Sequence, residues 1–203
     1  MQVNYHNNTI EKPQGKRTSA RIIQFDELNR YIEIFQKVVD ITSPTKAVTL
    51  WIATGCSETH VVNVLYSVIV LFGGGYRIWG RFGAIYNSST HKINEVLSYV
   101  YNHRDEDVDI LRRELKQILG LGGLSYSTKM LRFLSPNHVV LDSILQEELC
   151  ISEKDYHIFA SHCRQIAKIL QVNAVDVESG LYAYVQIANP DQRKYAWKRY
   201  QEK

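Results

Sequence analysis

Apolar residues recur at the spacing of an α-helix along most of this 203-residue chain. Between residues 93 and 101 they occupy positions i, i+3, i+4, i+7 and i+8, which places them on one face of a helix. The segment 108–118 repeats the pattern; it begins acidic and becomes basic, as the helix dipole favours. The segment 61–72 is apolar on nearly every side and predicts a buried helix. We therefore expect an all-α fold.

The length predicts one domain or a small pair of lobes, because domains usually have about 100–200 residues. We expect a helical domain over residues 21–203. Residues 1–20 are polar and contain several basic side chains, so we expect a flexible basic tail that is either solvated or a nucleic-acid arm. Residues 195–200 predict a basic terminal helix. The net charge of +3 permits a nucleic-acid partner but does not require one.

The cysteines and histidines exclude several kinds of site. Cys56, Cys150 and Cys163 include no C-x-x-C pair, so neither a disulfide framework nor a four-cysteine metal site is expected. The seven histidines show no metal-ligand spacing, and we expect no metal and no cofactor. Residues 61–72 are too few to span a bilayer, and the first residues lack the apolar core of a signal peptide. We expect a cytoplasmic protein.

The most informative stretch is residues 115–142. It predicts one helix that ends at glycines, a tight turn, and a second helix. Glycine adopts positive φ angles and lets another backbone approach closely, and amides at the start of a helix can hold a phosphate. This is the chemistry of a helix-hairpin-helix DNA clamp. The alternative is a glycine-capped helix end with an ordinary turn; a dinucleotide fold is disfavoured because Ser125 replaces the last glycine of G-x-G-x-x-G.

Two residues behind these glycines suggest catalysis. Lys129 falls early on the second helix, and Asp142 lies thirteen residues further on, before the next helix. An amine is a nucleophile only when neutral, and burial near a helix N-terminus favours the neutral form. A carboxylate can relay a proton or stabilise positive charge on a sugar. The pair suits attack on C1′ with loss of a base, although singly each residue fits a solvated lysine and an N-cap.

The stretch resembles the catalytic core of helix-hairpin-helix DNA glycosylases, and most closely the compact bacterial proteins similar to 8-oxoguanine DNA glycosylase. LGLGG, LSYSTKMLRFLSP and HVVLD carry the resemblance. It implies a compact, two-lobed all-α domain with a helix-hairpin-helix motif and an active site between the lobes. It also implies Lys129 as Schiff-base nucleophile and Asp142 as helper, removing an oxidised or modified base such as 8-oxoguanine, with AP lyase activity as a second step.

The implied partner is double-stranded DNA containing a damaged or modified base, bound by a monomer. The DNA-binding candidates are Gly120, Gly122, Gly123, Ser125, Ser127 and Arg132. The sequence departs from the better-known members at Leu124, where their lysine follows the hairpin's last glycine. Two alternatives therefore remain: Lys129 is the nucleophile from a deeper position on the helix, or Asp142 alone activates a water.

A flipped base needs apolar or aromatic walls. The glycine-rich segment 73–83 offers Trp79 and Phe82 as candidate walls, and Arg77 and Arg81 as phosphate contacts; packing in the core is the alternative for the aromatic pair. Three other functions stay open. They are a non-catalytic helix-hairpin-helix DNA-binding module, a glycosylase that acts on modified foreign (phage) DNA, and a helical protein–protein adaptor.

Overall fold

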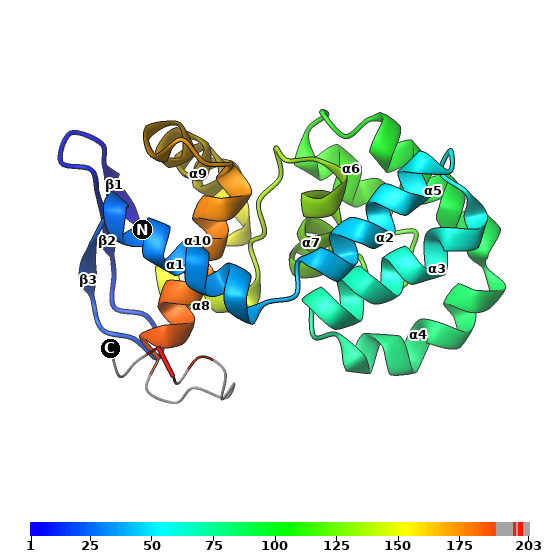
Figure 1. The fold of residues 1–203 in the computed structure, drawn as a ribbon, viewed down its shortest axis with the longest axis horizontal. Coiled ribbons are helices and arrows are strands. Elements are labelled where there is room, and N and C mark those ends of the chain that lie inside the picture. The colour runs from blue at the N-terminus through cyan, green and yellow to red at the C-terminus, as the bar shows by residue number, and fades with distance from the viewer. Residues whose placement is uncertain (190–196, 198, 201–203) are drawn as a thin grey trace. The chain divides into compact units, whose positions relative to one another are not determined.

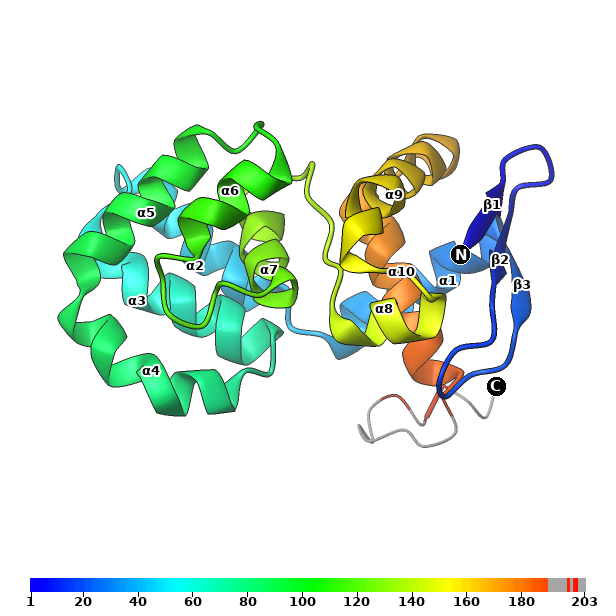
Figure 2. The same cartoon turned by 180° about the vertical axis from the view of Figure 1, so that it is seen from behind.

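The computed structural model describes residues 1–189, 197, 199 and 200, and it is mostly helical (Figures 1 and 2). The predicted terminal helix over residues 195–200 falls largely outside the described residues. Contacts divide the chain into two compact units: unit 1 contains Met1–Val39 and Leu141–Lys203, and unit 2 contains Asp40–Val140. Within the described part of the chain, no helix combines the length and apolar character needed to cross a membrane.

Unit 1 combines a small antiparallel sheet with helices from both ends of the chain. Its elements are β1 (Gln2–Asn4), β2 (Thr9–Lys12), β3 (Arg21–Gln24), α1 (Phe25–Val38), α8 (Ser143–Leu149), the 3-10 turn η2 (Glu153–Asp155), α9 (Tyr156–Leu170) and α10 (Ala174–Ile187). The strand order is β1-β2-β3, and α1 packs against α10. Gly180 permits this close packing, because a Cβ atom there would lie 3.0 Å from Ile32 Cγ1.

The segment expected to be a flexible tail instead forms β1, β2 and the loop that leads to β3. Ile10 and Ile23 pair across β2 and β3, and both are fully buried. The loop is held by Glu148 of α8, whose Oε1 accepts the Arg17 amide at 2.9 Å and whose Oε2 accepts the Thr18 hydroxyl. Burial of the isoleucines and these distant contacts make the N-terminal residues part of unit 1.

Unit 2 is helical throughout its described residues. Its elements are α2 (Thr42–Ala53), α3 (Glu58–Tyr66), the π-helix η1 (Ser67–Phe72), α4 (Tyr76–Ser88), α5 (Thr90–Asn102), α6 (Val108–Leu115) and α7 (Leu124–Leu134). The prediction of a buried helix over residues 61–72 is confirmed by α3 and η1, where Val61, Leu65 and Ile69 are fully buried. The stripe over residues 93–101 is confirmed by α5, which buries its apolar face.

Candidate functional site

A glycine turn, residues 116–123, joins α6 to α7 within unit 2. Its central residue Gly120 has a φ of +85°, in the region that favours glycine. Leu121 is buried and its amide donates to Ile118 O at 3.0 Å, which closes the turn. Gly123 is exposed and serves as the N-cap of α7, with no side chain to satisfy the first amides of the helix. The first amides of a helix have no partner within the helix itself.

α4 supports the glycine turn from one side. A Cβ atom at Gly120 would lie 2.7 Å from Ile78 Cγ2 and 3.1 Å from Tyr86 Oη, so the turn is tightly packed against this helix. The Tyr86 hydroxyl donates a hydrogen bond to the Leu119 carbonyl. Burial of this tyrosine raises its pKa to about 12. The phenol therefore stays neutral at physiological pH and acts as a fixed donor to the turn.

Lys129 lies on α7 with only 9% of its surface exposed. Its Nζ donates to Ser125 Oγ at 3.3 Å and lies 5.0 Å from the centroid of the Tyr126 ring. Lysine is rarely buried to this extent in proteins. Leu124, which takes the position of the lysine in the better-known glycosylases, is the first residue of α7 and is also buried.

Tyr126 links α7 to the glycine-rich segment that follows η1. Its hydroxyl donates to the Gly73 carbonyl at 3.4 Å. Side chains at Gly73 or Gly75 would collide with the tyrosine, since added Cβ atoms would lie 3.0 Å from its Cε1 and 2.8 Å from its Oη. Tyr126 is not among the site residues predicted from the sequence. Its spacing of three residues from Lys129 is the one sequence feature that places the two side chains on the same helix face.

Two of the predicted DNA-binding side chains have structural partners. Ser127 is fully buried; its Oγ donates to the Gly123 carbonyl at 2.9 Å and accepts from Arg112 Nε at 3.3 Å. Its hydroxyl thus fastens α7 to α6 from inside the unit. Arg132 is partly exposed, and its guanidinium lies 5.4 Å from the centroid of the Phe72 ring. Ser125 is also partly exposed, as is Gly122.

The predicted wall residues Trp79 and Phe82 belong to an aromatic cluster. Trp79 contacts Tyr66 edge-on at a centroid distance of 4.9 Å, and Tyr86 at 5.5 Å. Phe82 lies 6.4 Å from the Tyr86 ring and beside Gly120. Both side chains therefore pack against Tyr86, the residue that donates a hydrogen bond to the glycine turn.

Asp142 lies in unit 1, immediately before α8. Its Oδ1 accepts the amides of Ile144 and Leu145, both at 3.1 Å, so it is the N-cap of this helix. The side chain is 6% exposed. Burial, and in second place the negative charge of Asp142, raise the pKa of Tyr182 on α10. The carboxylate is thus held in one position, and its negative charge disfavours ionisation of the neighbouring Tyr182.

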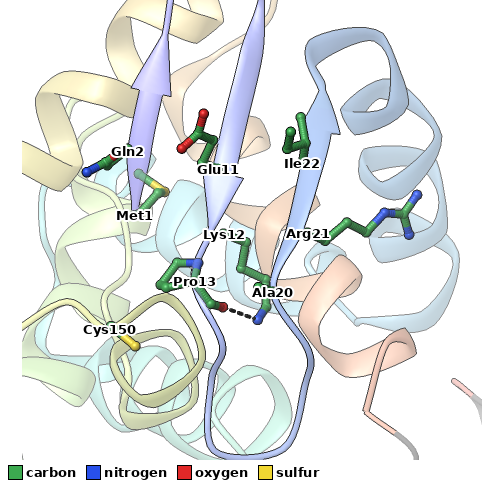
Figure 3. A pocket seen from close by; sticks show the side chains of 9 residues that line it. All are labelled: Met1, Gln2, Glu11, Lys12, Pro13, Ala20, Arg21, Ile22 and Cys150. Atoms are coloured by element: carbon green, nitrogen blue, oxygen red, sulfur yellow. Dashed lines mark hydrogen bonds between the residues drawn. The ribbon is translucent and has the colours of Figure 1, made fainter.

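A hollow beside the three-stranded sheet lies within unit 1 (Figure 3). Lys12 lines it and is almost fully buried; its Nζ donates to the carbonyls of Pro13 at 2.8 Å and Ser19 at 3.1 Å. Burial lowers the pKa of Lys12. The amine closes the loop between β2 and β3, which gives this second buried lysine a structural role.

Comparison of the chain with protein-family models, with curated proteins and with solved structures found no match. Unit 2 supplies a buried amine behind a glycine turn, and unit 1 supplies a buried carboxylate at a helix N-terminus. An amine of this kind can form a Schiff base with a sugar C1′, and a fixed carboxylate can assist the departure of a base.

Proposed function

We propose that this protein is a DNA glycosylase that removes an oxidised or otherwise modified base, such as 8-oxoguanine. Lys129 attacks C1′ of the damaged nucleotide, the bond from C1′ to the base breaks, and the base leaves with a proton. The C1′–O4′ bond of the resulting aminal then breaks, with O4′ taking up a proton, which gives a Schiff base. This imine also permits AP lyase chemistry, in which C2′ loses a proton and the C3′–O bond breaks by β-elimination. The finer fold assignment, a two-lobed domain with a helix-hairpin-helix motif, is part of the same proposal.

The burial of Lys129 is the observation that carries the proposal. An exposed lysine on a helix needs no special explanation, whereas a buried one loses hydration and remains only where it is useful or well paired. Its Nζ donates to Ser125 Oγ and lies over the Tyr126 ring, and both residues belong to the same helix. A buried amine held by such contacts is a candidate nucleophile.

Asp142 has a structural role that is compatible with catalysis. As an N-cap it is fixed in one orientation by two backbone amides. We propose that the same carboxylate stabilises the positive charge that develops on the sugar as the base departs. The N-cap alone explains its position, so its catalytic role needs a variant that separates cap from charge.

The glycine turn supports DNA binding in the proposal. The amides that begin α7 follow the exposed Gly123, and an open helix N-terminus of this kind suits a backbone phosphate. Contacts of this type position a protein on DNA without reading its sequence. They leave the identity of the excised base to other residues.

Borohydride trapping tests the proposal. Duplex oligonucleotides containing 8-oxoguanine, uracil, hydroxymethylated cytosine or an abasic site are incubated with the protein, and borohydride reduces any imine to a stable amine. We expect a covalent band with the wild type, none with Lys129→Gln, and an undiminished band with Lys168→Gln, in which an exposed lysine of α9 is changed. The hydroxymethylated cytosine tests the alternative of modified foreign DNA.

The three outcomes have different meanings. A band lost only in Lys129→Gln supports the Schiff-base mechanism. Base release without a band points to water activated by Asp142. If every substrate gives neither a band nor base release while duplex DNA is still bound, the glycosylase proposal fails and the non-catalytic DNA-binding module is favoured. Binding without any salt dependence would also exclude a phosphate clamp.

A further inference from the structure

Acidic residues are missing from two segments that pack together in unit 2. Asp and Glu account for 21 of the 203 residues, yet none occurs in residues 59–94 or in residues 115–140. The first segment contains α4, and the second contains the glycine turn and α7. Because Tyr86 of α4 donates to the turn, two segments that contain no negative side chain of their own meet here.

Arg81 neighbours Phe82, a residue of α4 that meets the glycine turn. Its guanidinium carbon lies 5.1 Å from the centroid of the Phe82 ring. The Phe82 ring faces the glycine turn, since its Cδ2 is 3.4 Å from the position that a Cβ atom would take at Gly120. An arginine stacked on an aromatic ring keeps its N–H donors directed outward and loses little freedom when it binds an anion.

Further exposed residues on α4 extend this surface. Arg77 lies one turn before Arg81, and Tyr76 is 68% exposed. Gly80 lies between Arg77 and Arg81 in the sequence. No atom lies within 4 Å of the position that a Cβ atom would take there, so the helix backbone is open to close approach. We call the set Tyr76, Arg77, Gly80 and Arg81 the α4 face.

We propose that the α4 face binds the sugar–phosphate backbone of duplex DNA, with Arg77 and Arg81 each contacting a phosphate. The inference rests on the proposed function, because it takes DNA as the ligand. Guanidinium groups bind phosphates through paired N–H donors. A surface without carboxylates avoids repulsion of a polyanion, and an open glycine permits its close approach.

The salt dependence of binding to an undamaged duplex tests the inference. Each phosphate contact contributes about 0.9 to the slope of log Kobs against log salt concentration. The double variant Arg77→Gln/Arg81→Gln should therefore lower the slope by about 1.8 and weaken binding roughly sixtyfold at 0.1 M salt. The matched control is Arg164→Gln/Lys168→Gln, two exposed basic residues with the same spacing on α9. We expect the control to leave both the slope and the trapping unchanged.

The inference is overturned if the slope of the double variant equals that of the wild type, or if the control pair lowers it equally. It is also overturned if the arginines are needed for binding to vesicles of phosphatidylserine and phosphatidylcholine but not to duplex DNA. Wild-type trapping separates the two proposals. If the wild type is trapped but the double variant has an unchanged salt slope, only the proposed role of the α4 face is rejected. If the double variant has a lowered slope but the wild type is not trapped, the glycosylase proposal is rejected and DNA binding by the α4 face is kept.

Discussion

Lys129 Nζ lies 3.3 Å from Ser125 Oγ, its hydrogen-bond acceptor one turn earlier on α7. If this hydroxyl positions the amine, Ser125→Ala should slow borohydride trapping about fivefold, since an ordinary hydrogen bond contributes about 1 kcal/mol. Single-turnover trapping at saturating DNA measures the effect, and circular dichroism checks the fold. An unchanged trapping rate would show that Ser125 has no positioning role.

Gly120 and Gly123 should respond differently to alanine. Gly120→Ala places a Cβ atom at positive φ and 2.7 Å from Ile78 Cγ2, so we expect a loss of at least about 2 kcal/mol in the free energy of unfolding. Gly123→Ala enters open space at a φ of −80° and should cost less than about 1 kcal/mol. Urea denaturation compares the two; equal losses would contradict the tight packing at Gly120.

Tyr86 should make stability sensitive to alkaline pH. Its folded pKa of about 12 exceeds the ordinary value of 10, so the unfolded chain releases this proton first and folding weakens above pH 10. The loss is about 1 kcal/mol at pH 11. Tyr86→Phe loses about 1 kcal/mol at pH 8 through the missing bond to Leu119 O but escapes the alkaline loss. Thermal unfolding should therefore show that the difference in stability between the wild type and Tyr86→Phe shrinks from pH 8 to pH 11. A constant difference would contradict this explanation.

Two substitutions at Asp142 separate its two roles. Asp142→Asn keeps an oxygen that caps α8, so the free energy of unfolding should change by less than about 0.5 kcal/mol, whereas Asp142→Ala should cost about 1–2 kcal/mol. Both remove the charge, and base release should fall at least about a hundredfold in each. Urea titration and alkali-revealed strand cleavage measure these effects. Full activity in the stable Asn variant would limit Asp142 to capping.

Glu148 should control protease access to the loop between β2 and β3. Glu148→Ala removes the acceptor of the Arg17 amide and the Thr18 hydroxyl, which should open the loop and speed tryptic cleavage there about ten- to hundredfold. Its neighbour Glu147 is the matched control. It makes only a surface ion pair with Lys16 at 3.6 Å, so Glu147→Ala should change the rate little. Equal cleavage of both variants would mean that Glu148 does not hold the loop.

Helices with local determinants could be predicted from the sequence. In α6 the residues Val108, Leu111 and Leu115 are buried as their spacing indicates, and Asp107 caps the helix by accepting the Asp109 amide at 2.8 Å. Ser152 and Asp155 likewise form a capping box three residues apart. These features depend on residues within one or two turns of each other, which a sequence pattern contains.

Features that depend on distant residues could not be predicted. The strands around Ile10 and Ile23 are short, and each becomes stable only by pairing with the other and covering the core of unit 1. The packing of Tyr126 against Gly73 joins residues 53 positions apart. The sequence predicts Lys129 on a helix and Asp142 immediately before the next one. The burial of Lys129 depends on packing that no local pattern contains.

The division of the chain also sets an order of events on the ribosome. Unit 2 is one continuous segment, so all of it has been synthesised before α8 begins. The last residue of α1 is Val38 and the first of α10 is Ala174, 136 residues later. At about 5–20 residues per second, α1 is made roughly 7–27 s before its packing partner. During synthesis its apolar side therefore lacks the cover it has in the finished protein, and this interval is the time in which the nascent chain most needs a chaperone.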